Sequence, residues 1–321
     1  MANRQQLQTD MGTRDSLTWE FDGIRMGHAV SKFQALTSFS SSSPNTDMVR
    51  LHIGLKGNYS FAQRQLNATY DLIGGHHNII YSRDFDMVVH NRTLELETFG
   101  IQFPREVFLR FTQNANDVLQ RFAAKIINGE SALLSDEWGA VDPAIQQVVD
   151  QVVHHHYSGD LEKLFLLSKS IEILVLCAES CHRASEKQNT DPGIIKTAAD
   201  KERIIAARDL VNERVDRPPS LSEIARLVGL NEYKLKRGFK ETFQTTVFGY
   251  LTGQRLQLAR RYLLDSDKTA AEIAAELGYS TPQHFNNAFK QHFGHTPNSI
   301  RPGRPEARSD REAPSDRNAK R

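Results

Sequence analysis

The sequence AAEIAAELGYSTPQHF, residues Ala270–Phe285, combines a short apolar helix pattern, a glycine and a polar helix start. About fifty residues earlier in the chain, LSEIARLVGLNEYKL (Leu221–Leu235) shows the same order of Glu-Ile-Ala, glycine and polar helix start. Glycine is expected at such a sharp turn because it adopts a positive φ without steric cost. Each copy is therefore predicted to be a helix-turn-helix.

The second helix of each copy has two faces. The core stripe is predicted to hold Leu235, Phe239 and Phe243 in the first copy and Phe285, Phe289 and Phe293 in the second. The opposite stripe holds Tyr233, Lys236, Arg237 and Lys240 in the first copy and Gln283, Asn286, Asn287 and Lys290 in the second, with His284 on its flank. Long hydrogen-bonding side chains at this spacing suit a helix laid in a major groove. One polar stripe alone could be a solvated surface, whereas two in register favour DNA reading.

The helix starts and the joining segment support this interpretation. Asn231 and Thr281 suit helix N-caps, and Pro282 suits the first helical position. Residues Val247–Asp265 contain no proline and show helical spacing. A helix of that length is about 28 Å long, and successive major grooves on one face of DNA recur about 34 Å apart. The doubled unit is therefore predicted to read two adjacent turns of DNA.

Composition limits the class of protein. The 321 residues are 25% charged and 39% hydrophobic, a profile typical of soluble globular proteins with room for two domains. The sequence shows neither a long apolar span nor a secretory signal pattern, and it holds two cysteines. We therefore expect a cytoplasmic protein. The net charge is +1, but residues 196–301 hold 17 Lys and Arg against 12 Asp and Glu, which fits a polyanion-binding module.

The N-terminal half alternates apolar and polar residues in short runs, which indicates β-strands. The expected strands are Met48–Leu55, Asn78–Ser82, Phe85–His90 and Thr93–Phe103, separated by turns at Ser40–Asp47, Lys56–Asn58 and Gly74–Asn78. Helices are predicted near Pro104–Thr112, Asp117–Ile127, Pro143–His156 and Asp160–Arg183. The predicted fold class is α+β: an N-terminal, cupin-like β-barrel with following helices, then an all-α domain with two helix-turn-helix units.

These patterns predict the domain boundaries. The expected order is a disordered N-terminus (1–17), an effector-binding and dimerisation domain (18–185), a linker (186–193), the DNA-binding domain (194–301) and a disordered tail (302–321). The helix at Asp160–Arg183 has a wide apolar stripe that includes Leu164 and Ile171. This stripe can pack against the barrel, form a homodimer seam, or do both.

Residues Ala198–Arg301 resemble the DNA-binding domain of the AraC/XylS family of bacterial transcription regulators. The resemblance rests on the runs EIA…G…LKRGFK, RLQLARRYLL and IAAELGYSTPQHFNNAFKQHFGHTPNSIR. The run GLNEYKLKRGFKETFQTTVFGYL is also similar to the subgroup of pyochelin-type siderophore regulators, and the likeness extends weakly into Gln146–Leu174.

The resemblance implies roles for particular residues. Family base-reading positions fall on Tyr233, Lys236 and Arg237 in the first unit and on Gln283, His284 and Asn287 in the second. It implies promoter DNA, RNA polymerase and a small-molecule effector such as a siderophore as partners. The apolar stripe at Asp160–Arg183 adds a second copy of the chain as an expected partner, and the hydropathy predicts no membrane contact. Two positions depart from the family pattern: Gly238 lies inside the first recognition helix, and Ile300 stands where tyrosine is usual.

Other candidate residues carry weaker signals. Trp19, His76 and His77 are candidates for effector contacts, the two histidines on a glycine-rich turn. The run His154–His156 fits a solvated helix end better than a metal site, because consecutive helical residues point apart. Cys177 and Cys181 are four residues apart and can be buried thiols or a redox pair. The sequence predicts no metal site, cofactor or catalytic residue.

Two functions are compared. The first is a sequence-specific transcription regulator whose N-terminal domain senses an effector and whose C-terminal domain binds DNA. The alternative is a metal-dependent, cupin-type enzyme fused to a DNA-binding domain. No pairing of nucleophile and base is evident and two cysteines are too few for a multi-cysteine zinc site, so we expect a regulator and not an enzyme.

Overall fold

The computed structural model describes residues 2–43, 46–136, 138–190, 193–195 and 197–300, with the backbone alone at 43, 184–190 and 198. The chain divides into two compact units. One unit consists of Met1–Arg214 with Pro218–Leu251, and the other of Val215–Arg217 with Thr252–Arg321. The first unit therefore holds the N-terminal sheets and the first helix-turn-helix, and the second unit holds the second helix-turn-helix.

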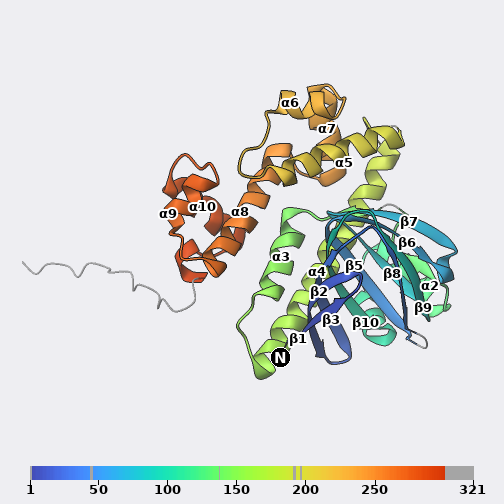
Figure 1. The fold of residues 1–321 in the computed structure, drawn as a ribbon. Coiled ribbons are helices and arrows are strands. Elements are labelled where there is room, and N and C mark those ends of the chain that lie inside the picture. The colour runs from blue at the N-terminus through green and yellow to red at the C-terminus, as the bar shows by residue number, and fades with distance from the viewer. Residues whose placement is uncertain (1, 44–45, 137, 191–192, 196, 301–321) are drawn as a thin grey trace, which may run out of the picture. The chain divides into compact units, whose positions relative to one another are not determined.

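The N-terminal strands form two antiparallel sheets (Figure 1). The eight-stranded sheet has the order β1 (Asn3–Thr9), β2 (Gly12–Phe21), β3 (Ile24–Phe33), β10 (Glu95–Pro104), β5 (Met48–Lys56), β8 (His76–Ser82), β11 (Ala132–Leu133), and β12 (Gly139–Ala140) also pairs with β8. The four-stranded sheet has the order β4 (Ser38–Ser43), β9 (Phe85–Asn91), β6 (Asn58–Gln63), β7 (Ala68–Ile73), with the 3-10 turn η1 (Arg64–Leu66) between β6 and β7.

Helices make up most of the remaining described residues. After the sheets come α1 (Arg105–Thr112), α2 (Asp117–Ile127), α3 (Pro143–Val153) and α4 (Gly159–Thr190). The helix-turn-helix units consist of α5 (Ala198–Glu213), α6 (Leu221–Leu227), α7 (Glu232–Phe243), α8 (Val247–Asp265), α9 (Ala270–Glu276), α10 (Pro282–Phe293) and the short η2 (Pro297–Ile300). The predicted order of sheets, helices and an all-α C-terminal region is confirmed.

The β-rich N-terminal domain of the predicted cupin-like β-barrel is confirmed as two antiparallel sheets, and the described strands form no closed barrel. A sheet closes only when its end strands pair. Here β1 ends one side of the larger sheet, and the other side ends at strands of two residues, β11 and β12. Strands this short offer too few hydrogen bonds to continue the sheet into a barrel.

The first seventeen residues also differ from the expectation of disorder. Asn3–Thr9 and Gly12–Phe21 form a hairpin in which Asn3 pairs with Thr18. Every residue of β1 is exposed, so the strand depends on main-chain bonds and on the ion pair between Arg4 and Asp15. A strand that buries no side chain leaves no apolar alternation in the sequence, which is why the pattern did not show it.

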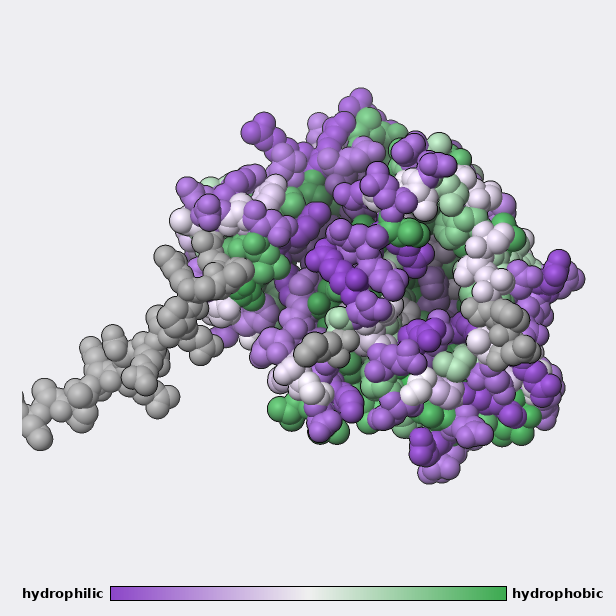
Figure 2. All heavy atoms as spheres, turned by 60° about the horizontal axis from the view of Figure 1, so that its bottom comes forward, coloured by the Kyte–Doolittle hydropathy of each residue, from purple (hydrophilic) through white to green (hydrophobic). Residues whose placement is uncertain are grey.

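Two further boundaries moved. Ser38–Ser43 is a strand that overlaps the predicted turn at Ser40–Asp47, and α4 continues to Thr190, into the predicted linker 186–193. The predicted tail 302–321 lies outside the described residues. No helix of the described chain is long and apolar enough to cross a membrane, and Figure 2 shows a largely hydrophilic face broken by separate hydrophobic patches.

The two faces of the larger sheet pack differently. Val49, Leu51 and Ile53 of β5 belong to a core that also contains side chains of α1, α2, α3 and α4. Figure 1 shows α3 and α4 beside the sheets. On the other face, Ile80 and Leu96 join a second core with side chains of the four-stranded sheet. The N-terminal domain is therefore a layer of helices, a large sheet and a small sheet.

Both helix-turn-helix units begin with the same capping box. The Glu223 amide donates to the Ser220 hydroxyl at 3.3 Å, and the Ser220 amide donates to the Glu223 carboxylate at 2.8 Å. Thr269 and Glu272 make the same pair of bonds at 3.2 Å and 2.6 Å. The glutamate of each Glu-Ile-Ala run therefore caps the start of its helix, because its carboxylate accepts a hydrogen bond from an amide that has no partner within the helix.

The turns and second-helix starts are as the sequence predicts. Gly229 and Gly278 have φ of 69° and 74°, values that favour glycine. Asn231 and Thr281 cap α7 and α10 by accepting from the amide three residues later. The core stripes of both helices are buried. Ile300 is half-buried and packs against the core of the second helix-turn-helix.

Gly238, the departure inside the first recognition helix, has a packing reason. A Cβ at this position would lie 2.5 Å from Cδ1 of Ile195 and 2.9 Å from Cδ1 of Ile204. Glycine therefore allows α7 to approach Ile195 and α5 more closely than alanine would. The closer packing offsets the lower helix propensity of glycine, which costs about 1 kcal/mol relative to alanine.

We expect Gly238→Ala to lower the free energy of unfolding by about 1–3 kcal/mol, since overpacking outweighs the gain in helix propensity. Gly253→Ala in α8 is the matched control, because a Cβ there meets no atom within 4 Å. The control should raise stability by about 0.5–1 kcal/mol. Urea titrations followed by circular dichroism measure both changes. A stabilising Gly238→Ala would contradict the close packing.

Candidate nucleic-acid interface and ligand-binding face

The predicted base-reading residues of the first unit lie on the exposed face of α7. Tyr233 is 62% exposed, and Lys236, Arg237 and Lys240 are also exposed. Lys236 pairs with Glu232 at 3.2 Å, and an Arg237 Nη donates to the Tyr233 hydroxyl at 3.4 Å. These contacts lie along one helix and at the surface, so they exchange readily for contacts with a ligand.

Lys234 has a different role from its neighbours on α7. Its ammonium lies 2.7 Å from the Asp200 carboxylate, and the two side chains join α7 to α5. The hydrogen bond from Lys234 lowers the pKa of Asp200. Lys234 therefore stabilises the unit, and the positive charges of Lys236, Arg237 and Lys240 remain on the outer face.

The second recognition helix presents amides and an imidazole. Gln283, His284, Asn287 and Lys290 of α10 are exposed. The Gln283 amide donates to the Asn287 side-chain oxygen at 3.3 Å, and His284 Nδ1 lies 2.9 Å from the Ser280 hydroxyl. These groups can donate to and accept from base edges, and Lys290 can bind a phosphate.

Asn286 is placed differently from the rest of the predicted stripe. It is half-buried, and its side-chain oxygen is buried without a hydrogen-bond partner among the described residues. It directly follows the core residue Phe285, so it lies at the edge of the core face. The geometry favours Gln283 and Asn287 over Asn286 for contact with a base.

The candidate effector residues lie in the core and not at a pocket rim. Trp19 belongs to the core shared with the helices, and His77 is fully buried. The turn is limited to Gly74 and Gly75, and His76 begins strand β8. Burial lowers the pKa of His76 to about 4 and of His77 to about 3, so both are neutral at pH 7.

A different face of the N-terminal domain has the features of a ligand site. Strand register places Thr18, Gly27, Gly100, His52 and Asn78 in one row across five strands of the larger sheet. Directly paired residues of a sheet point to the same side. The row faces the smaller sheet, because His52 bonds to the Tyr59 hydroxyl on β6.

The centre of this row, which we name the glycine floor, consists of Gly27 and Gly100. A Cβ at Gly27 would meet only Thr18 Cγ2 and the Leu17 carbonyl within 4 Å, and a Cβ at Gly100 only the Leu51 carbonyl. All three atoms belong to the same sheet. No described atom of the smaller sheet therefore reaches the glycine floor, and both glycines are half-buried although they lie on inner strands.

Aromatic and polar groups border the glycine floor on one side. His52 meets Tyr59 and Trp138 edge-on, with ring centroids 5.9 Å and 6.5 Å apart. Burial lowers the pKa of His52 to about 4 and raises that of Tyr59. Trp138 Nε1 is buried without a hydrogen-bond partner among the described residues. This border offers stacking and one donor, and no charge.

The sequence analysis missed the glycine floor and His52. Glycine inside a β pattern often marks close approach of a ligand or backbone, and RMGHA and TFGIQ both contain that signal. What the sequence does not contain is the register that places the two glycines opposite each other.

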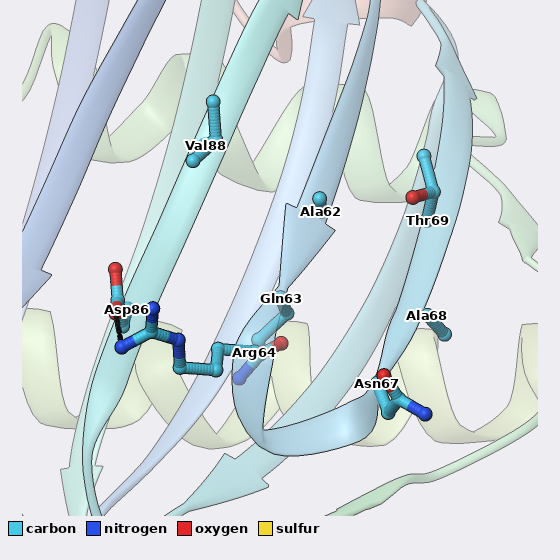
Figure 3. Close-up of a pocket in the computed structure, with 8 residues that line it drawn as sticks. All are labelled: Ala62, Gln63, Arg64, Asn67, Ala68, Thr69, Asp86 and Val88. Carbon is cyan, nitrogen blue, oxygen red and sulfur yellow. Dashed lines mark ion pairs between the residues drawn. The ribbon is translucent and has the colours of Figure 1, made fainter.

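The smaller sheet has an open groove on its outer side (Figure 3). The groove has a volume of about 400 Å³, and its lining includes Ala62, Thr69 and Val88. At one end Arg64 and Asp86 form an ion pair at 3.5 Å. The lining contains no aromatic ring and only aliphatic or polar side chains, so the groove is the weaker site for an aromatic ligand.

The remaining candidates have structural roles. His154 and His156 are exposed at the end of α3, as expected of a solvated helix end, and His154 Nδ1 lies 3.0 Å from the Asp150 carbonyl. The His155 side chain instead lies beside Glu162 and Trp19. Both cysteines are buried, and burial raises the thiol pKa of Cys181 to about 12. The described residues contain no group of three or more metal-ligating side chains.

The apolar stripe on α4 divides into two faces. Leu166, Ile173, Leu174 and Cys177 pack into the core. The other face is exposed and carries Leu161, Leu164, Ile171 and Val175, of which Leu164 is 63% and Ile171 38% exposed. Their spacing of three, seven and four residues follows a heptad pattern. The described protein thus leaves an apolar seam uncovered.

Comparison with known protein families gives two matches. Residues 26–193, more than half of the chain, match the family described as the regulatory protein PchR N-terminal domain. Residues 224–302 match the helix-turn-helix domain family. The two matches cover the strands from β3 onward, the helices α1 to α4 and both recognition helices.

Relatives are named as regulators. The chain is 37% identical over 124 residues to regulatory protein PchR of Pseudomonas aeruginosa, covering 39% of this chain and 41% of that protein, less than half of its length. It is 30% identical over 91 residues to regulatory protein SoxS of Escherichia coli K12, covering 28% of this chain and 85% of that protein. A solved AraC-type regulator structure from Chromobacterium violaceum is 29% identical, with a TM-score of 0.30, and covers 32% of this chain and 92% of that one.

Proposed function

The chain belongs to the AraC-type helix-turn-helix transcription regulators that carry a PchR-type N-terminal domain, and we propose that it binds promoter DNA through both recognition helices in response to a small-molecule effector. The observation that carries the proposal is the doubled, identically capped unit with an exposed polar stripe on each second helix. These families are regulators and not enzymes, so the fused-enzyme alternative is set aside.

Two units in one chain suit two adjacent major grooves. Helix α8 is unbroken from Val247 to Asp265 and connects the units. Its length of about 28 Å is close to the spacing of about 34 Å between major grooves on one face of DNA. We propose that Tyr233, Lys236 and Arg237 read one groove and that Gln283, His284 and Asn287 read the next. Binding of promoter DNA would place the chain in the cytoplasm, with RNA polymerase as a partner.

Selection of duplexes from a random pool by the full chain, followed by footprinting, tests the function. Arg237→Ala should weaken binding to the selected duplex by about 1–3 kcal/mol and relax selectivity at one position. Lys240→Ala is the matched control, because a phosphate contact should weaken binding to selected and scrambled duplexes alike. Equal losses on both duplexes for Arg237→Ala would show that Arg237 does not read a base.

The glycine floor is the proposed effector site. Its flat backbone suits a planar ligand, and Trp138 offers a donor. His52 is neutral, so recognition depends on stacking and hydrogen bonds more than on charge. The resemblance to siderophore regulators makes siderophores with aromatic rings the first ligands to examine.

Gly100→Leu should abolish the response to the effector, because the added side chain would occupy the space above the glycine floor. DNA binding without effector should remain. Ala62→Leu, in the outer groove of Figure 3, is the control and should keep the response. Thermal shifts and DNA titrations with a panel of siderophores measure both variants. If only Ala62→Leu lost the response, the effector would bind in the outer groove instead.

The uncovered face of α4 is the proposed homodimer seam. Exposed leucines in a heptad pattern are typical of helix pairing, since a second copy buries the same stripe on itself. Dimerisation would place four recognition helices on a repeated site and strengthen binding through a high effective concentration.

The double variant Leu164→Glu with Ile171→Glu should yield folded monomers, because charge in the seam opposes burial while the core face of α4 is unchanged. Sedimentation velocity at micromolar concentration measures the mass, and circular dichroism checks the fold. Lys163→Glu, at an exposed position beside the seam, should remain dimeric. An unmodified chain that sediments as a monomer with and without DNA would refute the seam.

A further inference from the structure

Arg208 on α5 is a buried arginine that binds the N-terminal sheets. Its side chain is 3% exposed. Nη1 donates to the Gly74 carbonyl at 2.5 Å, and Nη2 donates to the Asn58 side-chain oxygen at 2.9 Å. Nε and Nη2 also donate to the Asp209 carboxylate at 3.0 Å and 2.5 Å. One guanidinium therefore joins the first helix of the DNA-binding region to two sites on the sheets, all within the first compact unit.

The two acceptors on the sheets are held firmly. The Asn58 amide donates to the Thr93 hydroxyl at 2.9 Å, and Asn58 pairs with Ile73 at the end of the β6–β7 hairpin. A Cβ at Gly74 would lie 3.0 Å from the backbone of Gly57, so this turn has no spare room. Arg208 therefore binds a rigid corner of the domain.

The same corner contacts the first recognition helix. The Arg208 guanidinium lies over the ring of Phe243, the last residue of α7, with 5.4 Å to the centroid. The His76 ring meets Phe243 edge-on at 6.0 Å. Because Lys234 and Asp200 join α7 to α5, a movement of Arg208 would also move the recognition helix.

The corner also adjoins the proposed effector site. Asn58, which binds Arg208, directly precedes Tyr59, whose hydroxyl bonds to His52 beside the glycine floor. A ligand that contacts His52 or Tyr59 therefore acts next to a direct partner of Arg208. The connection from ligand face to recognition helix runs through contiguous side chains, as energetic coupling requires.

We infer that Arg208 is a positioning residue that couples the ligand face of the sheets to the first recognition helix; the inference rests on the proposed DNA-binding function. Arginine keeps its charge, and a buried charge must stay paired. The contact with Asn58 and Gly74 is therefore either complete or lost to water. Tyr233 and Arg237 remain exposed while it is formed, so the contact orients α7 without covering its base-reading face.

The test uses the full chain and the duplex that the unmodified chain selects. Arg208→Ala and Asn58→Ala should each raise the dissociation constant about tenfold, within the 5- to 150-fold range typical of coupling between sites. The double variant should lose no more than the larger single loss, because both changes remove one contact. Asn58→Asp keeps an acceptor and should bind within about twofold of the unmodified chain, as should Arg203→Ala, which lies on the exposed side of the same helix.

Hydrogen exchange without DNA measures the coupling separately. Asn58→Ala should speed exchange at Gly75 and in the last turn of α7, and Asn58→Asp should not. Circular dichroism checks that Arg208→Ala folds. If this variant does not fold, the comparison of Asn58→Ala with Asn58→Asp tests the coupling. The inference is overturned by single variants that bind as the unmodified chain does or more tightly, by losses that multiply in the double variant, or by unchanged exchange in α7. A folded chain that selects no duplex contradicts the proposed function, whereas the exchange result still decides the coupling.

Discussion

The first amides of a helix have no partners within the helix, and both helix-turn-helix units depend on how these amides are satisfied. In α6 and α9 a hydroxyl and a carboxylate three residues apart bind each other's main chain, so helices of only seven residues begin at a fixed position. The left-handed glycines then fix where each second helix starts. With both ends fixed, the phenylalanine stripe is directed inward and the polar stripe outward. The DNA-reading surface is therefore a consequence of main-chain bonding that the recognition residues themselves do not make.

The N-terminal domain uses its larger sheet in two ways. One face is packed by large apolar side chains against helices. The other packs Ile80 and Leu96 against the smaller sheet and also carries Gly27, Gly100 and the neutral His52. The chain continues from this domain into α5, where a single buried guanidinium meets the sheet corner. The N-terminal sheets and the first helix-turn-helix thus share one compact unit in the described structure.

The sequence predicted the helix-turn-helix region closely because its signals are local. Caps, glycine turns and the 3.6-residue stripe lie within a few residues of each other, and the doubled copy checks each one. The N-terminal domain was predicted less well. Strand β1 buries no side chain and so has no apolar pattern, and the turn assigned to Gly74–Asn78 is mostly a buried strand. The glycine floor and Arg208 depend on pairing between residues far apart in the chain, such as Gly27 with Gly100 and Asn58 with Arg208. Local sequence patterns do not reveal pairs of residues this far apart in the chain.

The two cysteines can report when the core between α4 and the larger sheet opens. Cys177 and Cys181 are its only thiols, both are buried on the core face of α4, and burial raises the pKa of each. A thiol reagent reacts with the exposed thiolate, so it reaches these sulfurs only when α4 separates from the sheet. The rate of labelling in the absence of denaturant therefore measures how often that core opens, and it does so without any added probe.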